Sequence, residues 1–148
     1  MNVLLLNGPN LNLLGEREPQ TYGSTTLLQL EQLFAGRAQE LGVGVRAFQS
    51  NHEGALIDRL HEARKWAQGC VINPGAYTHY SYALRDAIAS VPAISVVEVH
   101  ISDLMKREPW RQVSVIHEVV AHRIMGKGVA GYLEALEWLV AREQAARS

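Results

Sequence analysis

Short continuous runs of apolar residues alternate along the chain with longer stretches in which apolar residues recur every three or four positions. The short runs predict strands buried on both faces, and the longer spacing predicts helices with one face against the core. This alternation is typical of a parallel sheet covered on both faces by helices. No linker or repeat divides the chain, so we expect one domain over residues 1–148. The strands are expected at residues 3–6, 43–48, 70–73, 94–99 and 119–125; residues 43–48 alternate instead of forming a continuous apolar run, so that strand is expected near a sheet edge.

The helix ends carry recognisable capping residues. Thr26 followed by Gln29 predicts a capping box at the start of the first long helix, and Gly42 is expected to end it. Asn51 is of the residue type that caps helices, so it is expected to begin the second helix. The last helix is expected to turn one apolar stripe to the core, formed by Val129, Leu133, Leu136 and Val140.

Two segments do not follow either period. Residues 8–24 are rich in Gly, Pro and Asn and exceed the usual strand-to-helix connection of about 2–6 residues, so a functional segment such as a lid is expected. Residues 101–118 contain Pro109, which interrupts any long helix there. Ligands of open parallel sheets bind beyond the carboxyl ends of the strands. The expected strand ends are followed by residues 7–10, 49–53, 73–79 and 100–102, and three of these four clusters are rich in Asn, His or Ser.

Composition narrows the functional classes. Fourteen Lys and Arg residues stand against fifteen Asp and Glu, giving a formal net charge of −1, so no basic excess points to nucleic acid or an anionic membrane. Cys70 is the single cysteine, which excludes an internal disulfide and fits a reducing compartment. No secretory leader is expected, and no apolar run approaches the roughly 18 residues of a membrane span. We therefore expect a cytoplasmic protein.

Several familiar motifs lack the context that they require. Gly126–Gly131 fits G-x-G-x-x-G, but too few residues follow it to complete a dinucleotide-binding unit, so a tight strand-to-helix turn is expected. His117 and His122 are five positions apart, whereas two zinc ligands on one helical face require four, so no metal site is expected. The chain also lacks a nucleophile-elbow serine and a phosphate-binding loop, and its three lysines are poorly placed for imine chemistry.

These exclusions leave acid–base chemistry without a cofactor. Glu98 and His100 are two positions apart on a predicted strand and so project from the same side, where the carboxylate can orient the imidazole. From the pattern alone, a purely structural hydrogen bond explains this pair equally well. Arg17 and Tyr22 lie in the long connection, where an arginine cation can stabilise a tyrosinate base. On spacing alone, a solvated arginine and a packed tyrosine are the simpler interpretation.

Blocks along essentially the whole chain resemble one family. Residues 6–19, LNGPNLNLLGEREP, are followed by Tyr22-Gly23 and are similar to the opening of type II 3-dehydroquinate dehydratases. Further blocks agree with that family in order and spacing: QSNHEG at 49–54, NPGAYTH at 73–79, ALRDA at 83–87 and EVHIS at 98–102.

The resemblance implies a flavodoxin-like three-layer α/β sandwich with a five-stranded parallel sheet of order 2-1-3-4-5. It implies dehydration of 3-dehydroquinate to 3-dehydroshikimate, without a cofactor, in the shikimate pathway of aromatic amino-acid biosynthesis. It also implies a homo-dodecamer made of four trimers.

The resemblance further implies a role for individual residues. Tyr22 would take a proton from C2 to form an enolate-like intermediate, and Arg17 would make the Tyr22 phenol more acidic. His100, oriented by Glu98, would help the C1 hydroxyl leave as water. Asn10 and Asn73 would position the waters or groups that stabilise the enolate oxygen and assist His100. Ile101 and Ser102 would bind through backbone N–H groups and Asp86 would come from a neighbouring subunit, within a substrate-binding set of Asn73, His79, Asp86, Ile101, Ser102 and Arg111.

One region departs from the family pattern. The family more often has Asn-Ile-His-Ala where residues 103–106 read Asp-Leu-Met-Lys, and its last strand is smaller and more apolar than the segment that ends in His122-Arg123. The packing near Arg107 and the contacts between trimers are therefore open. A second hypothesis is a non-catalytic flavodoxin-like binding or signalling module. Such a module needs clustered carboxylates or a phosphate loop after the first strand, where Asn7 and Asn10 stand instead.

Overall fold

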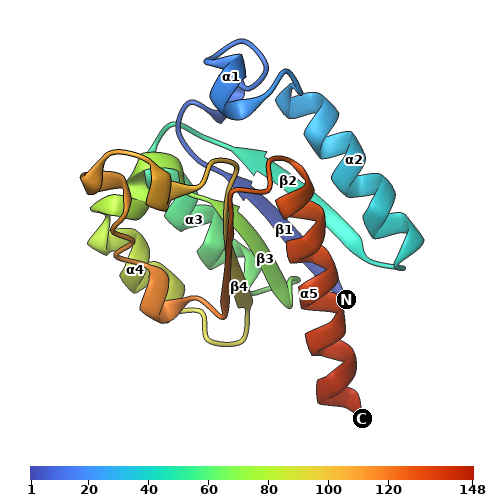
Figure 1. Cartoon of the computed structure of the whole chain (residues 1–148). Helices are drawn as coiled ribbons and strands as arrows, with labels where there is room; N and C mark the ends of the chain where they lie inside the picture. The colour runs from blue at the N-terminus through green and yellow to red at the C-terminus, as the bar shows by residue number, and fades with distance from the viewer.

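The computed structural model describes all 148 residues and contains a single five-stranded sheet. All strand pairs are parallel and the order is β2-β1-β3-β4-β5 (Figure 1), which confirms the expected flavodoxin-like topology. The last strand starts later than expected because residues 117–119 form a 3-10 turn. The strands are β1 (Asn2–Asn7), β2 (Gly44–Gln49), β3 (Gly69–Asn73), β4 (Ser95–His100) and β5 (His122–Met125).

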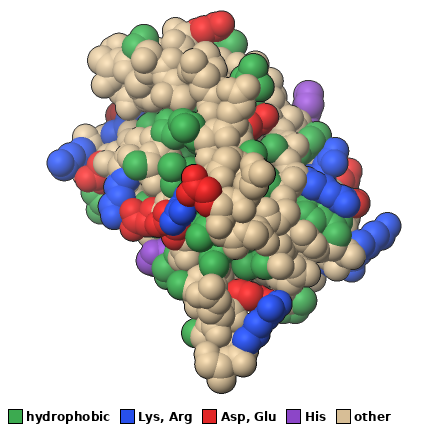
Figure 2. All heavy atoms as spheres, turned by 90° about the vertical axis from the view of Figure 1, so that its right-hand side faces the viewer, with side chains coloured by type: hydrophobic (Ala, Val, Ile, Leu, Met, Phe, Trp, Pro, Cys, Tyr) green, Lys and Arg blue, Asp and Glu red, His purple; other side chains and the backbone are tan.

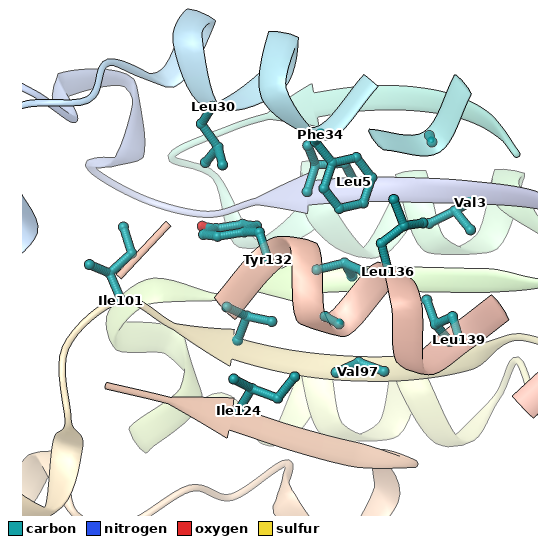
Figure 3. Close-up of a cluster of buried hydrophobic side chains, with 14 of the residues drawn as sticks. Val3, Leu5, Leu30, Phe34, Val97, Ile101, Ile124, Tyr132, Leu136 and Leu139 are labelled. Carbon is teal, nitrogen blue, oxygen red and sulfur yellow. The ribbon is translucent and has the colours of Figure 1, made fainter. Parts of the chain in front are cut away.

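Four long helices cover the two faces of the sheet. Helices α2 (Leu27–Glu40) and α5 (Ala130–Arg147) lie on one face, and α3 (Glu53–Ala63) and α4 (Tyr82–Ala89) lie on the other. Successive residues of β1 point to opposite faces, so Leu5 packs under α2 and α5 while Leu4 packs under α3 and α4. The first of these two cores is drawn in Figure 3, where Phe34 of α2 meets Leu5.

The inner face of α5 differs from the expected stripe. The buried residues of α5 are Gly131, Tyr132, Ala135, Leu136 and Leu139, and only Leu136 belongs to the expected set. The other expected residues are partly buried and pack against the edges of the same core. The expected stripe was therefore wrong: it is rotated about the helix axis relative to the face that is buried. Helix α5 packs against both the sheet and α2, so the face that it buries is broader than a single stripe.

Two expected helix caps have different outcomes. The capping box at α2 is confirmed: Thr26 Oγ1 accepts from Gln29 N at 3.2 Å, and Gln29 Oε1 accepts from Thr26 N at 2.9 Å. The expected cap at Asn51 is wrong, because α3 follows His52 and has no side-chain cap. The Asn51 Oδ1 atom instead accepts from the backbone N–H of Asn10 at 2.9 Å, which ties two strand-end loops together.

The segments without a period consist of short turns: residues 8–24 follow the carboxyl end of β1, and residues 101–121 run from the carboxyl end of β4 back to the start of the parallel strand β5. Residues 8–24 contain a 3-10 turn (Leu11–Leu13) and a single-turn helix, α1 (Pro19–Tyr22), and residues 101–121 contain three 3-10 turns. The G-x-G-x-x-G segment is the expected tight turn between β5 and α5, with φ of +79° at Gly126 and +60° at Gly128.

The outer surface is mixed in charge. On the face shown in Figure 2, basic and acidic side chains are interspersed with apolar ones and form no large field of one sign. Ion pairs between helices contribute to this mixing, such as Arg37 Nε with Glu137 Oε1 at 2.9 Å. None of the helices combines the length and apolar character needed to cross a membrane.

Candidate active site

A cavity of about 160 Å³ opens at the carboxyl ends of β1, β3 and β4. Open parallel sheets bind their ligands at this end, beyond the carboxyl ends of the strands. Glu98 is fully buried and contacts the lining residue His100, and Asp86 is exposed on the surface of the chain. The cavity is lined by nine of the eleven residues expected from the sequence: Asn10, Arg17, Tyr22, Asn73, His79, His100, Ile101, Ser102 and Arg111.

The expected Glu98–His100 pair forms at the end of β4. His100 Nε2 lies 2.6 Å from Glu98 Oε2, and Glu98 is fully buried. The carboxylate also accepts hydrogen bonds from the hydroxyls of Thr78 and Ser114, which the sequence did not single out. Burial would raise the pKa of the Glu98 carboxyl, but its hydrogen bonds to His100 and Thr78, with nearby positive charge, hold that pKa below its usual range. An ionised Glu98 therefore orients the His100 ring.

The phenol of Tyr22 lies between two arginines. Arg107 Nη1 donates to Tyr22 Oη at 2.7 Å, and it also lies 3.3 Å from Ser102 Oγ. Arg17, the cation expected at this place, lies over the ring with Cζ 4.9 Å from the centroid and does not contact the hydroxyl. The cation in direct contact with the phenol oxygen is thus Arg107, which the sequence analysis did not assign. Two permanent positive charges therefore lie next to the Tyr22 side chain, one at its hydroxyl and one at its ring.

A buried hydrogen-bond chain fixes the amide of Asn73. Tyr132 Oη, from α5, donates to Asn7 Oδ1 at 2.7 Å and accepts from Asn73 Nδ2 at 2.9 Å. On its other side, Asn73 Oδ1 accepts from Gly75 N at 3.1 Å. Burial raises the pKa of the Tyr132 phenol, so this hydroxyl stays protonated and keeps its donor role. Tyr132 was missed because the expected inner face of α5 was rotated away from it.

Close packing of two loops brings the polar groups of β1 and β3 together. Gly8 N donates to Asn73 O at 2.8 Å, and a Cβ atom at Gly8 would lie 2.8 Å from the Pro74 backbone. Only glycine permits this approach. Asn10, two positions after Gly8, is in the left-handed region, with φ of +69°, and lines the cavity.

His79 is a neutral imidazole at the far side of the cavity. Its Nδ1 atom lies 2.7 Å from the carbonyl oxygen of Val113, so Nδ1 carries the proton and Nε2 is an acceptor. Burial lowers the pKa of His79, and the charges of His100 and Arg111 lower it further. Trp110 holds the ring edge-on, with centroids 5.3 Å apart.

Asp86 is the one expected site residue that this chain does not bring to the cavity. It lies on the exposed face of α4, and the cavity lining does not include it. Its expected role in a neighbouring subunit's site therefore stays a prediction.

The fold and the cavity together define a flavodoxin-like α/β enzyme suited to acid–base chemistry. A tyrosine beside two arginines can remove a proton, and a carboxylate-oriented histidine can deliver one. Three arginines (Arg17, Arg107 and Arg111) line a small cavity and favour an anionic ligand. No group of three or more His, Cys, Asp or Glu side chains converges as metal ligands do.

Comparison with known proteins agrees with this class. The family described as "Dehydroquinase class II" matches residues 1–140. The "3-dehydroquinate dehydratase" of Bacillus pumilus is 56% identical over 139 residues, which cover 94% of each chain. The "Catabolic 3-dehydroquinase 1" of Aspergillus terreus is 52% identical over 136 residues, covering 92% of this chain and 89% of the relative.

A solved structure extends the agreement to three dimensions. The type II dehydroquinase from Butyrivibrio crossotus superposes with a TM-score of 0.93 at 47% identity, covering 94% of this chain and 97% of the other. The chain therefore belongs to the dehydroquinase class II family, and it is an enzyme of the lyase class. The resemblance seen in the sequence blocks is confirmed.

Proposed function

We propose that the protein dehydrates 3-dehydroquinate to 3-dehydroshikimate, without a cofactor, in the shikimate pathway. The observation that carries this proposal is the placement of the Arg107–Tyr22 contact, at 2.7 Å, in the same small cavity as the His100 ring that Glu98 orients. The names of the similar proteins from Bacillus pumilus and Aspergillus terreus support the same substrate.

The first step is removal of a proton from C2 of the substrate. The Tyr22 phenolate takes this proton, and the electron pair of the C–H bond moves into the adjacent carbonyl to form an enolate. The positive charges of Arg107 and Arg17 stabilise the phenolate before the step. The fixed amide of Asn73 and the neighbouring Asn10 place a bound water near the enolate oxygen.

The second step expels the C1 hydroxyl. The electron pair of the enolate returns to form the carbon–carbon double bond, and the bond from C1 to oxygen breaks. His100 gives its proton to the departing hydroxyl, which leaves as water. Tyr22 then holds the proton from C2 and His100 is neutral, so proton transfer through solvent returns both groups to their starting states. Glu98 keeps the ring of His100 in one orientation throughout.

Substrate binding uses the remaining cavity residues. Arg111 and the backbone N–H groups of Ile101 and Ser102 bind the carboxylate. All three residues line the cavity. The guanidinium of Arg111 carries a positive charge, and the backbone N–H groups are hydrogen-bond donors. The acceptor Nε2 of His79 receives a hydrogen bond from a ring hydroxyl.

The assembly completes the site. Asp86 is exposed on α4, where it is free to enter the cavity of a neighbouring copy. We place the chain in a homo-dodecamer of four trimers in the cytoplasm, and the lone buried Cys70 is compatible with a reducing compartment.

The direct test mixes purified, metal-free protein with 3-dehydroquinate and follows ultraviolet absorbance. The product contains a conjugated enone, so absorbance is expected to rise with time. A flat trace, with a known dehydroquinase active in the same solution, would contradict the proposal and favour a non-catalytic binding module.

A further inference from the structure

The arginine Arg123 lies next to the Glu98–His100 pair and has no part in the steps above. Arg123 of β5 is in register with Glu98 of β4, and its Nε lies 3.7 Å from Glu98 Oε1. The Arg123 side chain is only 14% exposed. Its Nε and Nη2 atoms are buried and make no protein hydrogen bond, so its main interaction with the protein is electrostatic.

The two oxygens of Glu98 face different partners. Oε2 faces His100 and Thr78, whereas Oε1 faces Arg123; the Ser114 hydroxyl lies between the two oxygens, 3.1 Å from Oε1 and 3.2 Å from Oε2. A buried arginine loses its hydration, and a nearby carboxylate must offset that loss. The Glu98 carboxylate is therefore shared between a permanent cation on β5 and a titratable imidazole on β4.

A permanent cation changes how readily this pair gives up a proton. With one proton bound, the carboxylate and imidazole together are neutral. Once that proton leaves, their net charge is −1, and a nearby positive charge stabilises this state. The sign is the same whether Glu98 or His100 carries the proton, because only the total charge of the pair matters.

We propose that Arg123 is a positioning residue that acts through Glu98 to make His100 a stronger acid. The inference deepens the proposed function, because it rests on His100 as the proton donor to the leaving hydroxyl.

Other charged or titratable groups also face His100. They come from α1, from the 3-10 turns and from β4, and none of them changes when residue 123 is replaced. A difference between variants at residue 123 therefore isolates the effect of its charge. These groups are Arg17, from the loop before α1, and Tyr22, His79, Glu98, Arg107 and Arg111.

The test is a pH titration of His100 by NMR of protein labelled with ¹³C-histidine. The His100 signal is assigned by its loss in His100→Gln. In Arg123→Met the midpoint of the His100 titration is expected to rise by about one pH unit. In Arg123→Lys, which keeps the charge, it is expected to stay close to that of the unmodified protein.

Arg46→Met is the matched control. Arg46 lies on β2, at the opposite edge of the sheet, with its guanidinium over Trp66. Its removal is expected to leave the His100 midpoint unchanged. If Arg123→Met does not fold, Arg123→Gln removes the charge while it keeps an N–H donor.

The rate measurement separates this inference from the proposed function. The high-pH limb of kcat is expected to move upward in Arg123→Met together with the NMR midpoint. An unmoved or lowered NMR midpoint would overturn the role of Arg123. A raised NMR midpoint with an unmoved rate profile would support the coupling between Arg123 and His100 and contradict His100 as the catalytic acid.

Discussion

Replacement of Arg107 by methionine removes the group that directly contacts the proposed base. Arg107→Met keeps an unbranched side chain in a position that is only 17% exposed, and it deletes the donor 2.7 Å from Tyr22 Oη. A hydrogen bond to a charged group is worth about 1.5–3 kcal/mol. If that stabilisation belongs to the phenolate, kcat should fall by roughly 10- to 150-fold.

Variants that keep the charge, or that lie outside the site, distinguish this effect from general damage. Arg107→Lys retains the charge and should lose less. Arg37→Met, on the outer surface of α2, is the control and should change kcat by less than about twofold.

A double-mutant cycle supplies the refutation. Arg107 and Tyr22 act through one phenolate, so Arg107→Met should add little to the loss already caused by Tyr22→Phe. The assay is the initial rate of enone absorbance at saturating substrate, with circular dichroism as the folding check. Losses that add fully, or an Arg107→Met enzyme within threefold of the original at every pH, would refute the reasoning.

Two further substitutions test the supports of the site. In Tyr132→Phe the buried amides of Asn73 and Asn7 lose a hydrogen-bond partner, so urea titrations should show a free energy of unfolding lower by about 1–3 kcal/mol. The kcat should also fall, because the Asn73 amide can then turn. Unchanged stability and kcat would contradict the hydrogen-bond chain. Asp86→Ala should lower activity if Asp86 belongs to a neighbouring subunit's site. The thermal unfolding temperature of the subunit should stay the same, because Asp86 is exposed in its own chain. Unchanged kinetics would count against a shared site.

Local patterns in the sequence were sufficient to predict those elements whose formation depends on residues close together in the chain. Continuous apolar runs identified the buried strands, and the Thr26–Gln29 pair identified the start of α2. The period of two along a strand placed Glu98 and His100 on one side, where they form a hydrogen bond of 2.6 Å. Their chemical role needed the family resemblance, since the same pair also suits a structural contact.

Tertiary packing decided what the sequence patterns could not. Arg107 meets Tyr22 across 85 positions, and both lie in segments of short turns that carry no period. Asn51 is a good capping residue, yet its oxygen is taken by the loop that follows β1. Asp86 has no partner in the site of its own chain, so no pattern within one chain could place it there.

The central claim is that Tyr22 is the base, and Tyr22→Phe tests it most directly. Phenylalanine keeps the ring between Arg17 and Arg107 but has no oxygen to accept the C2 proton. Turnover of 3-dehydroquinate should fall by roughly 10²- to 10⁴-fold or more, while calorimetry shows substrate bound within about threefold of the original affinity. A correctly assembled Tyr22→Phe enzyme that keeps most of its turnover would place the base elsewhere and contradict the account.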